Sequence, residues 1–176
     1  MSDLPEPWLR GPLADVNPIL VPVLRSFEQA REDLARHTEG LTTEQIWARP
    51  HGFGSVAFNI RHIIGSVDRL TTYLEERGLT EEQMSALGNE HEPGATRERL
   101  LGDLEAGLGR AEEIIGRLDV LKLSDARTVG RRHLPTTVIG LLIHIAEHTQ
   151  RHVGQAISAC RYTAALHLEP TIPDRG

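Results

Sequence analysis

The sequence has little cysteine, no concentrated positive charge and no long apolar run, and each shortage excludes a class of protein. Its single cysteine, Cys160, rules out an internal disulfide framework and any cysteine-based zinc pattern. The 25 acidic residues outnumber the 19 basic ones, and Lys and Arg dominate no stretch, which argues against nucleic acid or an anionic membrane surface as a partner. No run approaches the roughly 18 apolar residues of a membrane helix.

The N-terminal stretch also lacks a signal-peptide pattern, since MSDLPEPWLRGPLADVNP has early acids, several prolines and no apolar centre. Together with the single cysteine, this favours a cytoplasmic, reducing location. A content of 39% hydrophobic and 25% charged residues is enough for one globular core. We therefore expect a single domain over residues 1–176, with a core at about 17–164 and irregular tails.

Four segments carry apolar residues at helical spacings of three and four, and none alternates as a strand does. The long helices are predicted at about 17–38, 55–78, 96–118 and 135–164, with short capped helices at 42–49 and 80–89. Long helices joined by connections of uneven length predict an all-α fold. The expected architecture is a four-helix bundle with short extra helices in the connections.

Three glycines recur every seven residues on the third long helix, at Gly102, Gly109 and Gly116. Each glycine weakens a helix by roughly 1 kcal/mol relative to alanine. The repeat indicates either a close approach of another backbone or simple tolerance at exposed positions. The sequence leaves both interpretations open.

Two histidines, His148 and His152, lie four residues apart in HTQRHVGQ, toward the apolar side of the last helix. A rise of about 6 Å between them allows both imidazoles to reach one ion, as in the i, i+4 pair of helical zinc proteases. His144 lies too far from His152 to share that ion easily. The competing interpretation is ordinary histidines hydrogen-bonded near the core, and a metal site needs at least one further ligand.

A family resemblance is carried by NIRHIIGSVDRL (59–70) and HTQRHVGQ (148–155). The second segment resembles the H-x-x-x-H-x-G-Q signature in the last helix of the DinB-like or YfiT-like superfamily, and the first resembles that family's single histidine on the second helix. LTTEQIWARPHGFGSVAFNIRHI (41–63) resembles the family's approach to this histidine. The matching elements extend over roughly residues 20 to 160.

The resemblance implies an up-down-down-up bundle, often dimeric, with a metal held by His62, His148 and His152. His62 rests on the resemblance alone, because it lies more than about 100° from the apolar stripe of its helix. Neutral imidazole suits zinc or nickel first, and iron or cobalt also. Ligand imidazoles need acceptors for their second N–H; the candidates are Asn59 and Ser66 for His62, and Gln155 and Glu147 for the other two. Gln155 is the better candidate, because Glu147 fits a solvated surface acid more readily.

Any chemistry must come from the metal, because the sequence has no defensible Ser-His-Asp set, P-loop or Rossmann glycines. The resemblance implies thiol S-transferases that use bacillithiol, mycothiol or glutathione, a thiol-dependent isomerase, or hydrolases. Our hypothesis is a metal-dependent homodimeric enzyme that activates a low-molecular-weight thiol, or a water, against a small-molecule substrate.

Further residues have candidate roles in that hypothesis. Arg61, Arg69 or Arg151 could hold a carboxylate of the thiol, or lie on solvated helix faces, and His51 is a candidate acid or base. Cys160 is either a small buried hydrophobe or a reactive thiol. The alternative function is a non-catalytic, metal-stabilised helical dimer that acts as a binding or stress-related scaffold.

Overall fold

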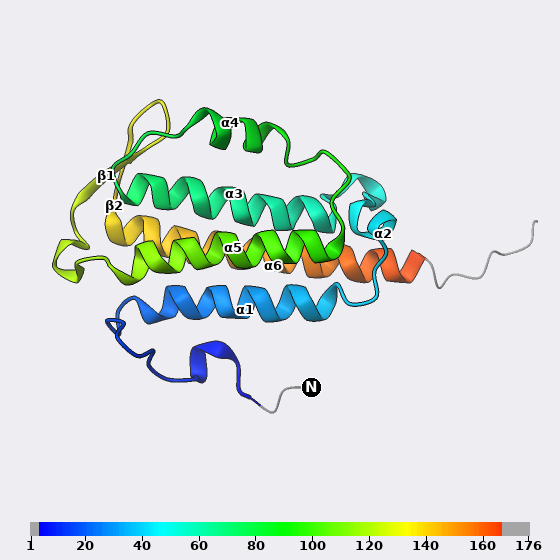
Figure 1. The fold of residues 1–176 in the computed structure, drawn as a ribbon, viewed down its shortest axis with the longest axis horizontal. Helices are drawn as coiled ribbons and strands as arrows, with labels where there is room; N and C mark the ends of the chain where they lie inside the picture. Colours follow the sequence, from blue (N-terminus) through cyan, green and yellow to red (C-terminus); the bar gives the residue numbers. More distant parts are fainter. Residues whose placement is uncertain (1–3, 167–176) are drawn as a thin grey trace, which may run out of the picture.

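The computed structural model describes residues 4–166, and most of them are helical. Four long helices lie side by side (Figure 1): α1 (Val21–His37), α3 (Val56–Leu74), α5 (Arg97–Gly116) and α6 (Val138–Leu166). Short helices are η1 (Pro7–Leu9), α2 (Thr43–Trp47), η2 (Pro50–Gly52), α4 (Glu81–Gly88) and η3 (Val120–Lys122). The prediction of a mainly helical fold is confirmed.

Side-chain caps explain where four of the helices begin. Thr42, Ser55, Thr80 and Thr96 each precede a helix and accept a hydrogen bond from the backbone N–H three residues later. These bonds satisfy N–H groups that have no partner within the helix. Both short helices and the start of the helix at Ser55 therefore lie where the sequence predicted them.

Two predicted boundaries are wrong by about one turn. The first helix begins at Val21 rather than Asn17, because the Asn17 side chain accepts from the Ile19 N–H and shapes a separate turn. The second helix ends at Leu74, before Gly78, since Glu76 has a positive φ of 59° that a helix cannot continue through.

The expectation of no strands is also wrong. Strand β1 (Ala126–Val129) pairs antiparallel with β2 (Leu134–Thr137), in a register that places Ala126 opposite Thr137. Pro135, predicted to start the last helix, lies in β2, and α6 begins at Val138. The hairpin escaped detection because both strands are short and contain no fully buried residue, so no alternating apolar pattern is needed.

The core lies between the four long helices, where α3 packs against α5 and α6, and α1 packs against the same two. The apolar stripe predicted on α3 is buried throughout, from Val56 to Leu74. The other helices add fully buried side chains to the same cluster: Phe27, Leu34, Leu104, Leu108, Ile115, Leu142 and Ile145. Burial of such stripes is the main stabilisation of a helical fold.

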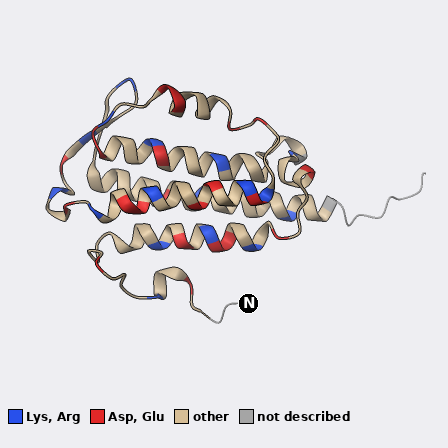
Figure 2. Ribbon diagram, viewed as in Figure 1, with Lys and Arg blue, Asp and Glu red and all other residues tan. Residues whose placement is uncertain are grey.

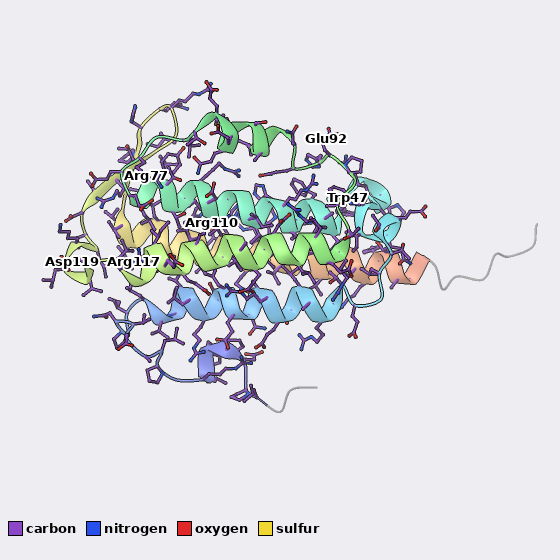
Figure 3. All side chains as sticks on the ribbon, in the orientation of Figure 1. Trp47, Arg77, Glu92, Arg110, Arg117 and Asp119 are labelled. Carbon is purple, nitrogen blue, oxygen red and sulfur yellow. The ribbon has the colours of Figure 1, made fainter. Side chains whose placement is uncertain are left out.

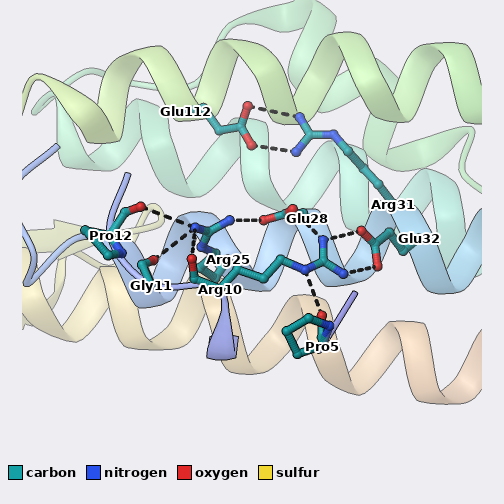
Figure 4. A network of polar contacts seen from close by, with 9 residues as sticks. All are labelled: Pro5, Arg10, Gly11, Pro12, Arg25, Glu28, Arg31, Glu32 and Glu112. Atoms are coloured by element: carbon teal, nitrogen blue, oxygen red, sulfur yellow. Dashed lines mark hydrogen bonds and ion pairs between the residues drawn. The ribbon is translucent and has the colours of Figure 1, made fainter. Parts of the chain in front are cut away.

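A polar network on α1 fastens two further parts of the chain to it (Figure 4). Arg10, in the N-terminal segment, donates to Glu28 at 2.6 Å and to Glu32 at 2.5 and 2.9 Å. Arg31 reaches across to Glu112 on α5 with two bonds of 2.5 and 3.0 Å. The N-terminal segment and α5 are thereby held against α1.

Charges of both signs are interspersed along the four long helices (Figure 2), so none of these four is uniformly basic or acidic. Among the helices of residues 4–166, none combines the length and apolar character needed to cross a membrane.

The glycine repeat on α5 has no close neighbour among residues 4–166. A Cβ built at Gly102, Gly109 or Gly116 would meet nothing within 4 Å among the described atoms. Close approach occurs instead at Gly107, where a Cβ would lie 3.1 Å from Ile64 on α3. Within the described chain, tolerance at open positions therefore accounts for the repeat.

Candidate metal centre

Helices α3 and α6 bring three imidazoles together in a half-buried position. The ring centroid of His62 lies 5.1 Å from that of His148 and 4.3 Å from that of His152, and the latter two are 4.6 Å apart. One potential ligand nitrogen from each residue lies within 4.8 Å of the others. His62, which was predicted from the family resemblance, thus lies beside His148 and His152, which were predicted from their spacing.

Each of the three rings has its Nδ1 atom beside an oxygen. His62 Nδ1 is 2.7 Å from Glu90 Oε2, and His152 Nδ1 is 2.9 Å from Asn59 Oδ1. His148 Nδ1 lies 3.3 Å from the Ser66 hydroxyl. Because carboxylate and amide oxygens only accept, Nδ1 donates in the first two pairs.

These partners leave the Nε2 atoms available. In the described part of the chain, no Nε2 of the three histidines has a hydrogen-bond partner. A neutral imidazole that donates from one nitrogen has its lone pair on the other, which is the arrangement of metal-bound histidines.

The predicted acceptors on α3 serve different rings from those expected. Asn59 and Ser66 were predicted to support His62, whereas they bond His152 and His148 on the facing helix. Both are buried, with exposed fractions of 1% and 8%. Because they point into the contact between α3 and α6, they meet rings across that contact rather than one on their own helix.

On α6, the preferred candidate acceptor Gln155 is not used by the three rings, whereas Glu147 is the solvated surface acid that the sequence favoured. Glu147 is exposed, accepts from His144 Nδ1 at 2.9 Å and forms an ion pair with Arg151. Gln155 is also exposed, and within the described residues it bonds to neither imidazole. Residues spaced by three or four on one helix meet each other at its surface, so these side chains stay outside the bundle.

Sequence reasoning missed Glu90, a buried carboxylate from the connection between α4 and α5. Its side chain is 6% exposed, accepts from His62, and takes two bonds of 3.2 Å from Arg69. Burial raises its pKa, but the bond from His62 and the charge of Arg69 outweigh that and hold the pKa of Glu90 below its usual range. In the sequence, Glu90 looks like any acidic loop residue.

A glycine on α3 makes room for this carboxylate. A Cβ at Gly65 would lie 2.9 Å from Glu90 Oε1 and 2.7 Å from Arg69 Nη1, both closer than a normal contact. The Glu90–Arg69 pair therefore lies directly on the backbone of α3 at Gly65.

The connection that carries Glu90 is held at two points. Arg61 donates to the carbonyl oxygens of Asn89, at 3.1 Å, and Glu92, and its guanidinium lies 4.7 Å from the centre of the Trp47 ring. Trp47 Nε1 donates to the Ala95 carbonyl at 2.9 Å. Figure 3 labels Trp47 and Glu92 at the α2 end of the helices.

The three arginines considered as thiol-carboxylate binders all have partners within the chain. Arg61 holds backbone carbonyls, Arg69 holds Glu90, and Arg151 pairs with Glu147. His51 is exposed on η2, with its ring edge-on to Tyr162 at 6.2 Å. It is therefore outside the three-histidine cluster.

Burial is the largest cause that lowers the pKa of His148 and of His152 to about 4, and the electrostatic interaction with the neighbouring His62 ring is the next. Both rings are therefore neutral at pH 7, the state in which imidazole binds metal. Protons do not compete appreciably for these two ligands at that pH.

The donor set fits a divalent transition metal. Zinc–nitrogen bonds of about 2.0–2.1 Å at tetrahedral angles place two ligand nitrogens roughly 3.4 Å apart. One ligand nitrogen of each histidine lies within 4.8 Å of the others, so binding of such an ion requires the three rings to move closer together. Three histidines leave a fourth position free, which is the ligand count of catalytic rather than structural zinc.

Comparisons with known proteins identify the family and the fold. Residues 26–156 match the model of the DinB superfamily. A conserved protein from Enterococcus faecalis, known from a crystal structure, has a similar fold, with a TM-score of 0.68 and 16% sequence identity over 81% of this chain and 95% of that one. No curated protein matches the sequence. The helical fold, the three-histidine cluster and above all the match over most of the chain show that this protein belongs to the DinB superfamily.

Proposed function

We propose that this protein is a metal-dependent enzyme that uses a low-molecular-weight thiol to attack an electrophilic small molecule. The metal ligands are His62, His148 and His152. The observation that carries the proposal is the convergence of three imidazoles whose Nδ1 atoms are all engaged elsewhere. Zinc or nickel suits these ligands best, with iron or cobalt as alternatives. Such an ion, when bound, lowers the pKa of a thiol or a water.

Residues around the imidazoles orient the rings and adjust their basicity. Glu90 accepts the Nδ1 proton of His62, and its negative charge makes that ring a stronger electron donor. Asn59 fixes the orientation of His152 in the same way. These bonds hold the rings in place before any metal or substrate arrives.

For the whole chain we propose a single cytoplasmic domain with up-down-down-up helix order. Supporting this order, the chain colours in Figure 1 progress in one direction along α1 and α6 and in the other along α3 and α5. We also propose a homodimer. It is supported by membership of the DinB superfamily, whose resemblance implies an assembly that is often dimeric.

The three-histidine cluster also supports a second candidate, a metal-stabilised dimer without catalytic activity that acts as a binding or stress-related scaffold. Metal would then raise the melting temperature but support no turnover. The two candidates share the metal site and differ only in chemistry.

The first experiment measures metal per chain by elemental analysis of protein purified without a His tag. We expect about one ion in the wild type and loss of metal in His148→Ala. His144→Ala is the matched control, since His144 lies one turn away on α6, is exposed and is not in the three-histidine group. Metal-free wild type, or equal metal in wild type and His148→Ala, contradicts the proposed site.

The second experiment measures turnover of 1-chloro-2,4-dinitrobenzene with glutathione, mycothiol or bacillithiol. In the proposed reaction the thiol sulfur forms a bond to the ring carbon, chloride leaves with the bonding electrons, and the thiol proton passes to solvent. A rate that requires both metal and one of the thiols supports the enzyme. Stoichiometric metal without thiol-dependent turnover supports the scaffold.

A further inference from the structure

A cavity of about 500 Å³ lies between the start of α3 and the C-terminal half of α6. Phe53 and Gly54, which precede α3, and Phe58 in its first turn form one wall. Gly154 and Tyr162 of α6 form part of the other. Its volume is in the range of small-molecule sites.

The cavity shares its wall with the candidate metal centre. Phe58, which lines it, stacks on His62 with ring centroids 5.5 Å apart. Asn59, also in the lining, accepts the hydrogen bond from His152. A molecule in this cavity therefore lies next to the residues that support two of the three imidazoles.

Aromatic side chains are concentrated here. The chain has three phenylalanines and two tyrosines, and Phe53, Phe58 and Tyr162 all line this cavity. Phe53 is 62% exposed and Tyr162 51% exposed, with ring centroids 6.3 Å apart. Exposed aromatic rings gathered around one hollow indicate a surface that contacts a ligand.

The polar groups of the lining are mostly satisfied within the chain. Arg151 is paired with Glu147, and the Asn59 amide donates to the Ser55 carbonyl at 2.9 Å. The lining thus has no unpaired charge for an ionic ligand to neutralise, which favours an apolar one.

Gly154 keeps the cavity open. It lies in the middle of α6, where glycine lowers helix stability by roughly 1 kcal/mol relative to alanine. A Cβ there would meet nothing within 4 Å, so no close neighbour requires glycine. Because Gly154 lines the cavity, a larger side chain at this position is expected to reduce the cavity volume.

From these observations we infer that the cavity binds a planar, apolar group of the substrate, an aromatic ring being the best fit. The inference names the substrate class for the proposed thiol transfer and rests on that proposal. Binding of the ring, however, depends on the cavity walls, so it is measurable without turnover.

The test uses 2,4-dinitrotoluene, an aromatic probe without a leaving group, titrated into the full-length protein by calorimetry. We expect Gly154→Leu to weaken probe binding by about tenfold or more, since leucine fills the cavity. Gly109→Leu is the matched control, because Gly109 is also a helical glycine with open space but lies on α5, away from the cavity. Its dissociation constant should equal that of the wild type.

Phe53→Ala provides a second variant that does not depend on the core, as Phe53 is largely exposed. It should also weaken binding, while the metal content of both cavity variants stays at the wild-type level. No binding to wild type, or equal binding in Gly154→Leu, Phe53→Ala and wild type, overturns the inference. If wild-type protein binds the probe but contains no metal, or shows no thiol-dependent turnover, the result would instead contradict the proposed function.

Discussion

Replacing Glu90 by glutamine tests whether the buried carboxylate supports the metal centre. The substitution keeps the shape of the side chain and an acceptor oxygen but removes the negative charge. His62 then loses a charged partner at 2.7 Å, and Arg69 loses the carboxylate that accepts its two bonds. Both effects act through a group that is only 6% exposed, so solvent screens them weakly.

The expected magnitude follows from these contacts. Loss of an outer partner of a metal-bound histidine typically lowers metal affinity by about 10–100-fold, which corresponds to about 1.4–2.7 kcal/mol. Hydrogen bonds to charged groups contribute about 1.5–3 kcal/mol, so the metal-free protein should also lose roughly that amount of unfolding free energy.

Competition with a chromophoric chelator measures the affinity, and urea unfolding of the metal-free protein measures stability. Glu92→Gln is the control, because Glu92 belongs to the same connection but has an exposed side chain, and only its backbone carbonyl is used by Arg61. Unchanged metal affinity in Glu90→Gln, or an equal loss in Glu92→Gln, would refute the assigned role.

Three further predictions concern glycine, cysteine and histidine. Gly109→Ala should raise the free energy of unfolding by about 0.5–1 kcal/mol, whereas Gly65→Ala should not, because its Cβ would displace a buried ion pair; urea unfolding compares them. Cys160 should react slowly with a disulfide reagent at pH 8 and fast once unfolded, since burial raises its pKa to about 11; rapid native labelling would be the contrary result. The metal-free protein should lose stability as pH falls from about 6.5 toward 4, because the unfolded chain takes up protons while the pKa values of His148 and His152 stay at about 4; a flat profile in denaturant titrations would contradict this.

Helix periodicity and capping predicted the elements that make the core. The stripe from Val56 to Leu74 needed only its own spacing to be recognised, and Ser55 and Thr80 marked helix starts by local chemistry. The hairpin and the exact start of α6 at Val138 were missed, because they depend on pairing between two short segments rather than on a local pattern.

In the candidate site, too, only the residues with a local sequence pattern could be predicted from that pattern. His148 and His152 share one helix, so their spacing alone placed them together. His62 required the family resemblance, because its position off the apolar stripe makes sense only once α6 is known to face it. Glu90 could not be predicted from the sequence, because it lies 28 residues from His62 and only the path of the α4–α5 connection brings the two together.

The bonds from Trp47 and Arg61 hold the α4–α5 connection, and with it Glu90, beside the three histidines. Shortening or exchanging this connection would leave the apolar core intact. It would, however, remove the carboxylate of Glu90 that accepts a hydrogen bond from His62. Natural variation in this connection is thus a route by which relatives could change the metal affinity of the proposed site while keeping all three histidines.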